Sequence, residues 1–264
     1  MYSPVHSQLE QLSAFLPASD ISQAQKKFDD TVAQVQDKLQ GIDDTIDKVQ
    51  LILDIFYFDN LFCLSVNQPH NAGHNMASAL AFHCAETPLL AVILVDLLRH
   101  AGVDADPVMA QAGALVRVSL SENQFIFIKA DSGMSLDWSE VEQHIGLRSQ
   151  DKLNKDDNKV KGPNDLTIAD NKEIDLLLLN LFKSELIELA EFEQAFEVSQ
   201  VLLELDPDNP YERRDRGFLL QQMDCDKLAV ADYEFFIKQC PKDPVAQVLK
   251  TQLPNMQNHR RDIH

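Results

Sequence analysis

The stretch TPLLAVILVDLLRHAG, residues 87–102, is the most apolar helical segment of the chain. Proline is favoured at the first helical position, so Pro88 predicts a helix start with Thr87 as its N-cap. Gly102 predicts the end, because glycine commonly follows the last helical residue. A helix that is apolar on most faces has to be buried. We therefore expect residues 87–102 to form the centre of a folded domain.

Beyond this helix the hydrophobic pattern changes from helical to alternating. VRVSL, residues 116–120, and QFIFI, residues 124–128, flank the polar turn residues SEN. Two alternating runs joined by a short polar turn predict a β-hairpin. The central helix is therefore expected to precede a small antiparallel sheet.

The segment before the central helix has apolar residues at three- and four-residue steps. This spacing predicts two helices over residues 5–40, divided near Pro17, and a third over residues 42–58. Helices and an antiparallel sheet that follow one another along the chain define an α+β fold class.

A sharp change of composition divides the chain. Residues 149–172 are rich in charge and lack aromatic side chains, which predicts a linker or a long exposed loop. We expect a first domain over residues 1–148 and a helical domain over residues 173–254. Residues 255–264 are expected to be a disordered tail.

The helical domain contains an internal repeat. Three pairs of like residues are 34 positions apart: Pro207 and Pro241, Pro210 and Pro244, and Ala195 and Ala229. A helix–turn–helix period of 34 residues is typical of tetratricopeptide repeats. In such repeats small alanines allow paired helices to cross closely, and proline marks the end of the second helix.

The order of these elements, with LDPDNPYERRDRGFLLQQMDC at residues 205–225, resembles a family of bacterial proteins. These are transglutaminase-like proteins with a tetratricopeptide tail, often described as regulators of invasion genes. The resemblance covers roughly residues 50–250. It implies a transglutaminase-like domain of N-terminal helices, a central buried helix and a small antiparallel sheet, followed by all-α tetratricopeptide-like helices.

The resemblance also implies where a catalytic triad would lie. Superfamily members open the central helix with a nucleophilic cysteine, followed by alanine four residues later, an arginine near the end and a closing glycine. Ala91, Arg99 and Gly102 match that pattern, which puts Thr87 in the place of the cysteine.

The other two triad positions follow on the strands. The family's Pro-Gly-His strand entry is matched by Gly113 and by Ala114, which replaces the histidine, and the third position falls on Asp131. Alanine cannot act as a base, and a threonine hydroxyl without an adjacent base is not activated. The degenerate triad at Thr87, Ala114 and Asp131 therefore predicts a pseudoenzyme.

A second interpretation makes Cys84 the catalytic nucleophile; it lies three residues before Thr87 in AFHCAETPLL. Cys84 would be a shifted nucleophile with His74 or His83 as its base, although neighbouring side chains on a strand or helix point apart. The alternative is a small buried thiol. No zinc-ligand spacing is present, so neither a metal nor a cofactor is expected.

Three arginines lie at the start of a predicted helix: Arg213, Arg214 and Arg216. Together with nearby acidic residues they could form a salt-bridged helix start. Alternatively, one of them could form a binding contact with a carboxylate of the first domain. The sequence leaves both open.

The net charge of −19 argues against nucleic acid and anionic membranes as partners, since both require basic surfaces. No apolar run is long enough for a transmembrane helix, and the first residues do not have a signal-peptide pattern. We therefore expect a cytoplasmic protein. Its oligomeric state is left open by the sequence.

These observations predict a non-catalytic interaction or regulatory protein whose partner is a protein or peptide. The alternative is a cysteine-dependent hydrolase or transamidase that uses Cys84. The partner, the ligand and the pathway are not determined by the sequence.

Overall fold

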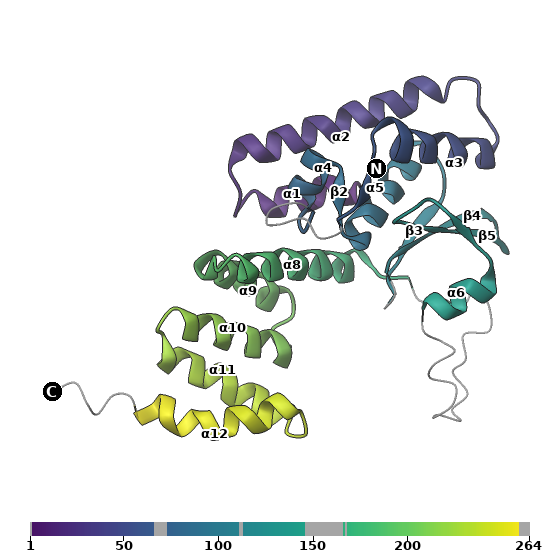
Figure 1. Ribbon diagram of the computed structural model, residues 1–264. Coiled ribbons are helices and arrows are strands. Elements are labelled where there is room, and N and C mark those ends of the chain that lie inside the picture. Colours follow the sequence, from purple (N-terminus) through teal and green to yellow (C-terminus); the bar gives the residue numbers. More distant parts are fainter. Residues whose placement is uncertain (1, 66–72, 111–112, 146–165, 167, 259–264) are drawn as a thin grey trace. The chain divides into compact units, whose positions relative to one another are not determined.

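The computed structural model describes residues 2–65, 73–110, 113–145, 166 and 168–258, and the chain divides into two compact units (Figure 1). The first unit is Met1–Leu178 and the second is Leu179–His264. Helices and a small antiparallel sheet form the first unit, and helices form the second. The predicted α+β class is confirmed.

The first unit begins with three helices, and the first two are separated near the predicted break. They are α1 (Pro4–Leu12), α2 (Ala18–Lys38) and α3 (Thr45–Asp54), which continues as the π-helical turn η1 (Ile55–Asp59). Pro17 is the N-cap of α2, so the division near this residue is confirmed. Asp44 caps α3 by accepting hydrogen bonds from the amides of Ile46 and Asp47.

The central helix is α5 (Thr87–His100), and every side chain from Leu89 to Leu98 is buried. The predicted end is also confirmed, because Gly102 has a φ of +74° just beyond the C-cap Ala101. The start is shifted by one residue. Glu86 occupies the N-cap position, so the prediction that Thr87 caps the helix is wrong.

A four-stranded antiparallel sheet follows α5 in the order β3-β4-β5-β6. Its strands are β3 (Ala105–Val108), β4 (Leu115–Ser121), β5 (Gln124–Lys129) and β6 (Ser135–Leu136). The predicted hairpin is β4 and β5, with Leu115 opposite Lys129. Helix α6 (Trp138–His144) closes the sheet core, where Val141 packs with Val108, Leu115 and Phe127.

A second, very short sheet precedes α5. Strands β1 (Cys63–Leu64) and β2 (Cys84–Ala85) pair in parallel, and helix α4 (Met76–Phe82) lies between them in the sequence. Sequence analysis did not predict these strands, because two residues are too few to show a period.

The second unit consists of paired helices. The unit boundary falls within α8 (Asn171–Glu188), which is followed by α9 (Phe192–Leu205), α10 (Pro210–Gln222), α11 (Asp226–Gln239) and α12 (Pro244–Asn258). Ala195 and Ala229 are fully buried, as the repeat predicted. A Cβ on Gly217 would lie 2.8 Å from the Tyr233 ring, so a small residue is needed where α10 crosses α11.

The domain limits inferred from composition fall partly where the structure is not described. Most of the predicted linker, residues 149–172, and the last residues of the predicted tail, 259–264, lie outside the described residues. Helix α8 begins at Asn171, and α12 continues to Asn258, beyond the predicted domain end at 254.

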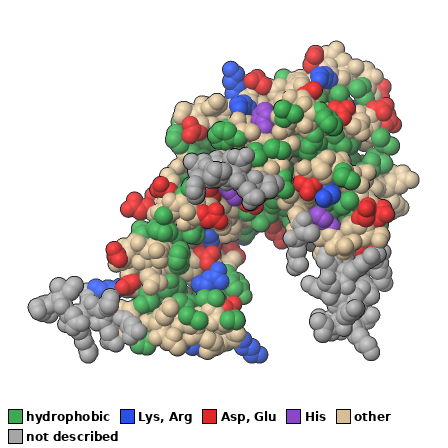
Figure 2. Space-filling model, in the orientation of Figure 1, with side chains coloured by type: hydrophobic (Ala, Val, Ile, Leu, Met, Phe, Trp, Pro, Cys, Tyr) green, Lys and Arg blue, Asp and Glu red, His purple; other side chains and the backbone are tan. Residues whose placement is uncertain are grey.

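The acidic balance of the sequence is visible at the surface. Figure 2 shows acidic side chains spread over the visible face, and the whole chain carries a net charge of −19. Like charges repel at this density, so the surface favours solubility over self-association.

Candidate functional site

Thr87 links the start of α5 to the entrance of β4. Its hydroxyl oxygen accepts a hydrogen bond of 3.1 Å from the backbone amide of Ala114. This tertiary partner explains why the side chain does not cap its own helix. Two of the three residues inferred from the superfamily pattern therefore lie in direct contact, although they are 27 positions apart in the sequence.

Gly113 permits this close approach. It has a φ of +115°, and a Cβ at this position would lie 3.2 Å from the Thr87 hydroxyl oxygen. Only glycine adopts such a backbone conformation readily. The strand entrance is therefore packed directly onto the helix start.

Asp131 lies two residues after the end of β5, next to Ala130, which is bonded to Ala114. The amide of Ala130 donates to the carbonyl of Ala114 at 3.3 Å, which continues the β4–β5 register. The Asp131 carboxylate lies 3.3 Å from the Lys129 ammonium group, while its other oxygen is buried without a hydrogen-bond partner among the described residues.

Tyr57 covers the same turn. Its hydroxyl donates to the carbonyl of Ala130 at 2.9 Å, and its ring fills the space that a side chain at Gly133 would need. Burial raises the pKa of Tyr57 well above its ordinary value, and the nearby Asp131 carboxylate raises it further. The tyrosine thus stays neutral and acts as a hydrogen-bond donor.

A histidine that sequence analysis missed also reaches this site. His144, in the last turn of α6, has its Nε2 atom 3.1 Å from the carbonyl oxygen of Gly113. Helix α6 is fixed by a capping box in which Asp137 and Glu140 bond reciprocally with each other's amides. The capping signal Asp137–Glu140 is visible in the sequence, but the position of the histidine over Gly113 depends on the packing of α6.

In the described part of the chain, the Thr87 hydroxyl is engaged by a backbone amide and not by a base. Within residues 2–65, 73–110 and 113–145, its hydrogen-bond partner is the Ala114 amide, and no imidazole or carboxylate bonds to it. His144 directs Nε2 to a backbone carbonyl instead. A hydroxyl nucleophile needs a neighbouring base to accept its proton. The bond from the Ala114 amide therefore holds the start of α5 against the residue just before β4.

The residues of the alternative site are engaged elsewhere. Cys84 is buried in β2, and His83 ends α4 with a φ of +54° and places Nδ1 2.5 Å from the carbonyl of Asn60. His74 pairs with Glu86 at 2.7 Å. Burial lowers the pKa of His83. Among the described residues, neither histidine forms a hydrogen bond to the Cys84 thiol.

The three arginines are bonded inside the second unit. Arg216 makes two hydrogen bonds of 2.7 Å to Asp232, and Arg213 lies 3.3 Å from the same carboxylate. Arg214 bonds Asp215 at 2.6 Å. Bidentate pairing of this kind fixes geometry as well as charge.

A buried lysine extends this charge network. The Lys183 ammonium group donates to Glu212 at 2.6 Å and to Asp215 at 3.0 Å, and the Ser199 hydroxyl donates to Glu212 at 2.6 Å. These contacts satisfy the buried charges and link α8, α9 and α10. The lysine was not singled out by sequence analysis, because nothing local marks it as buried.

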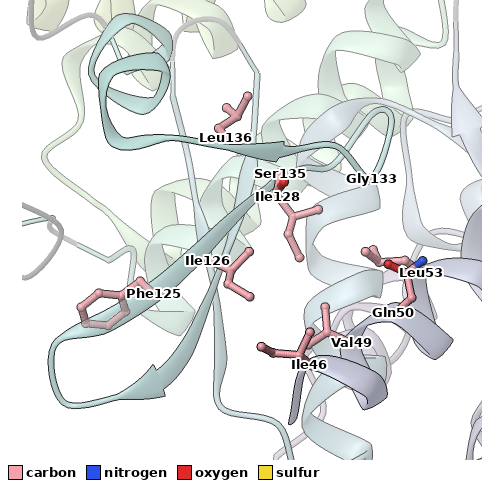
Figure 3. Close-up of a pocket in the computed structure, with 10 residues that line it drawn as sticks. All are labelled: Ile46, Val49, Gln50, Leu53, Phe125, Ile126, Ile128, Gly133, Ser135 and Leu136. Carbon is pink, nitrogen blue, oxygen red and sulfur yellow. The ribbon is translucent and has the colours of Figure 1, made fainter. Parts of the chain in front are cut away.

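An open pocket of about 400 Å³ lies between α3 and the sheet (Figure 3). Ile46 and Val49 of α3 face Ile126 and Ile128 of β5, and Gln50 supplies an amide at the edge. The pocket is lined by non-titratable side chains, so it offers apolar contact and not acid–base chemistry.

No group of three or more histidine, cysteine, aspartate or glutamate side chains is arranged to hold a metal ion in the described part of the chain. Among the described helices, none combines the length and apolar character needed to cross a membrane.

The fold and the site together define the class of protein to which this chain belongs. A strand entrance packed on the start of a buried helix, followed by helices with a 34-residue repeat, is the arrangement of a transglutaminase-like domain with a tetratricopeptide tail. Residues 22–180 match the family model of the transglutaminase-like superfamily, and residues 183–254 match that of the tetratricopeptide repeat. The chain therefore belongs to the transglutaminase-like superfamily.

Its curated relatives are bacterial. Protein SirB1 of Salmonella typhimurium is 30% identical over 175 residues, which cover 66% of this chain and 63% of SirB1. Protein YchA of Escherichia coli is 38% identical over 38% of this chain and 37% of its own length. A relative from Vibrio cholerae is 43% identical over 34% of each chain. Each match thus spans less than two thirds of the relative.

Proposed function

We propose that this chain is a non-catalytic interaction or regulatory protein of the cytoplasm, built on a degenerate transglutaminase-like fold. The observation that carries the proposal is the bond from the Ala114 amide to the Thr87 hydroxyl. It occupies the hydroxyl with a structural contact at the position where the superfamily has its nucleophile. Neither Thr87 nor Ala114 supplies the thiolate or the base that acyl transfer requires.

The tetratricopeptide unit supports a protein or peptide as the partner. Large apolar side chains are exposed on it at Tyr211, Phe218, Leu228, Val245 and Val248. Exposed apolar groups on a repeat scaffold favour association with another chain. The arginines, by contrast, are engaged by Asp232 and Asp215, so we assign them a structural role in this unit.

The cysteine-dependent alternative has weaker support. Cys84 is only 8% exposed, and no histidine contacts its thiol in the described part of the chain. Without a neighbouring base, the Cys84 thiol lacks the activation that a catalytic nucleophile needs.

An activity assay tests the loss of catalysis. The full chain is incubated with amide and ester substrates and with glutamine-containing peptides plus a primary amine, and products are measured by mass spectrometry. We expect no turnover above the heat-denatured protein. Turnover that is lost in Thr87→Ala or Cys84→Ser, and kept in the exposed control Thr251→Ala, would overturn the proposal.

A second assay tests the interaction role. Proteins that bind the tagged full chain in a bacterial lysate are cross-linked and identified, and the strongest is purified for a direct affinity measurement. Leu228→Asp and Val248→Asp are expected to weaken binding at least tenfold, while Phe58→Asp, at an exposed position of the first unit, leaves it unchanged. Equal affinity for all variants would contradict a role of the tetratricopeptide surface.

A further inference from the structure

Two free cysteines lie side by side just before the central helix. Cys63 of β1 and Cys84 of β2 are direct partners in the parallel register, and Cys63 is exposed whereas Cys84 is buried. Side chains of directly paired strand residues point to the same face of the sheet. The two thiols therefore face each other although they lie 21 positions apart in the sequence.

We propose that Cys63 and Cys84 form a reversible dithiol–disulfide pair, with an oxidised low-molecular-weight disulfide such as glutathione disulfide as the oxidant. The spacing suits the bond, because neighbouring strands lie about 4.8 Å apart and disulfides accept Cα separations of about 4.4–6.8 Å. The two strands thus need little movement to be bridged.

The surroundings hold both cysteines in place. The Cys63 amide donates to the carbonyl of His83 at 2.9 Å, so the backbones on either side of the pair are joined. The Phe62 ring stacks between His83 and Phe56, with centroid distances of 4.5 and 4.2 Å. A fixed pair forms a disulfide with less loss of chain freedom than a mobile pair.

The thiols also interact in the reduced state. Burial raises the pKa of the Cys63 thiol, and the neighbouring Cys84 side chain raises it further. This shift keeps the reduced form protonated and makes oxidation slower than for an ordinary exposed thiol, because the thiolate is the attacking species.

Exposure sets the order of the two exchange steps. The Cys63 thiolate attacks one sulfur of glutathione disulfide, which forms a mixed disulfide and releases one glutathione thiolate. The Cys84 thiolate then attacks the Cys63 sulfur and releases the second glutathione thiolate. The two cysteines lose two protons and two electrons in total, and the oxidant gains the electrons as two thiols.

The bond would tie η1 to the start of α5. Strand β1 follows η1 after three residues, and β2 leads through Glu86 directly into Thr87. A Cβ on Gly73 would lie 2.6 Å from the Cys84 carbonyl oxygen, so the backbone around β2 is already closely packed. Oxidation would therefore reinforce the helix start without rearranging the core.

Equilibration of the full chain in glutathione redox buffers tests the proposal. After alkylation of the remaining thiols, mass spectrometry is expected to find two alkyl groups where the reduced chain carries four, and a cross-linked peptide pair containing Cys63 and Cys84. The oxidised chain should melt about 5 °C higher than the reduced chain, as expected for a disulfide that closes the loop from Cys63 to Cys84.

Single-residue variants test the order of the two exchange steps, and their melting temperatures show whether each variant still folds. Cys84→Ser should accumulate one glutathione on Cys63, while Cys63→Ser should leave Cys84 unmodified because it is buried. Cys225→Ser and Cys240→Ser should still form the bond, and all four should melt within about 2 °C of the wild type under reducing conditions. A cross-link that involves Cys225 or Cys240, or oxidation that stops at the mixed disulfide in the wild type, would overturn the proposal.

Discussion

At the scale of single residues, Thr87 joins the start of α5 to the residue just before β4. Its hydroxyl accepts from the Ala114 amide, and Gly113 provides the close approach. Ala114 is only 4% exposed, so its amide has little access to water and depends on this acceptor. The contact stabilises the join between α5 and β4, and no proton transfer is needed for it.

Thr87→Val is expected to lower the free energy of unfolding by about 1–3 kcal/mol. Valine keeps the shape of threonine but removes the acceptor, so the Ala114 amide is left buried and unpaired. Urea denaturation measures the change. The control Thr251→Val, at an exposed site on α12, should stay within about 0.5 kcal/mol. Equal stability of the two variants would show that the bond contributes nothing.

At the scale of elements, a buried carboxylate fastens α1 to α5. Asp96 is fully buried in the middle of α5 and accepts from the Ser3 hydroxyl at 2.5 Å and from the Val5 amide at 3.0 Å. The second bond satisfies one of the free amides in the first turn of α1. Asp96, the charged residue of the buried stretch Leu89–Leu98, thus fixes the start of the N-terminal helix to α5.

Asp96→Ala is expected to cost about 2–4 kcal/mol, because it leaves the buried Val5 amide without an acceptor and removes the bond from the Ser3 hydroxyl. Amide hydrogen exchange should accelerate first in α1. The control Asp37→Ala changes an exposed carboxylate in α2 and should have little effect. Unchanged protection in α1 would contradict the docking role of Asp96.

At the scale of the whole molecule, charge is the dominant property. Forty-two acidic residues face twenty-three basic ones, and the folded chain keeps this excess of like charge in a small volume. Self-repulsion destabilises a compact state, and salt screens it over a Debye length of about 10 Å at 0.1 M. The ion pairs around Asp232 and Lys183 are less exposed to this screening because they are buried on at least one side.

Raising sodium chloride from 10 mM to 500 mM is therefore expected to increase the melting temperature by a few degrees. Differential scanning calorimetry at pH 7 measures the shift, and potassium chloride at the same ionic strength is the control. A fall in the melting temperature would show that favourable ion pairs outweigh the net repulsion.

Local and periodic features were predictable. The helical periods, the break near Pro17, the end at Gly102, the β4–β5 hairpin and the 34-residue repeat with buried Ala195 and Ala229 all follow from short-range patterns. The superfamily pattern also put Thr87 and Ala114 at positions that the fold brings into contact. These features depend on residues close together in the sequence or on a regular repeat, so the sequence alone carries the signal.

The sequence by itself thus determined the class of the fold and the order of its elements. Only the tertiary structure decided that Glu86, not Thr87, is the N-cap, that His144 reaches Gly113 and that Cys63 pairs with Cys84. The physical reason is the same in each case. Such contacts join segments far apart in the chain, and the packing around a buried helix selects them without leaving a local pattern.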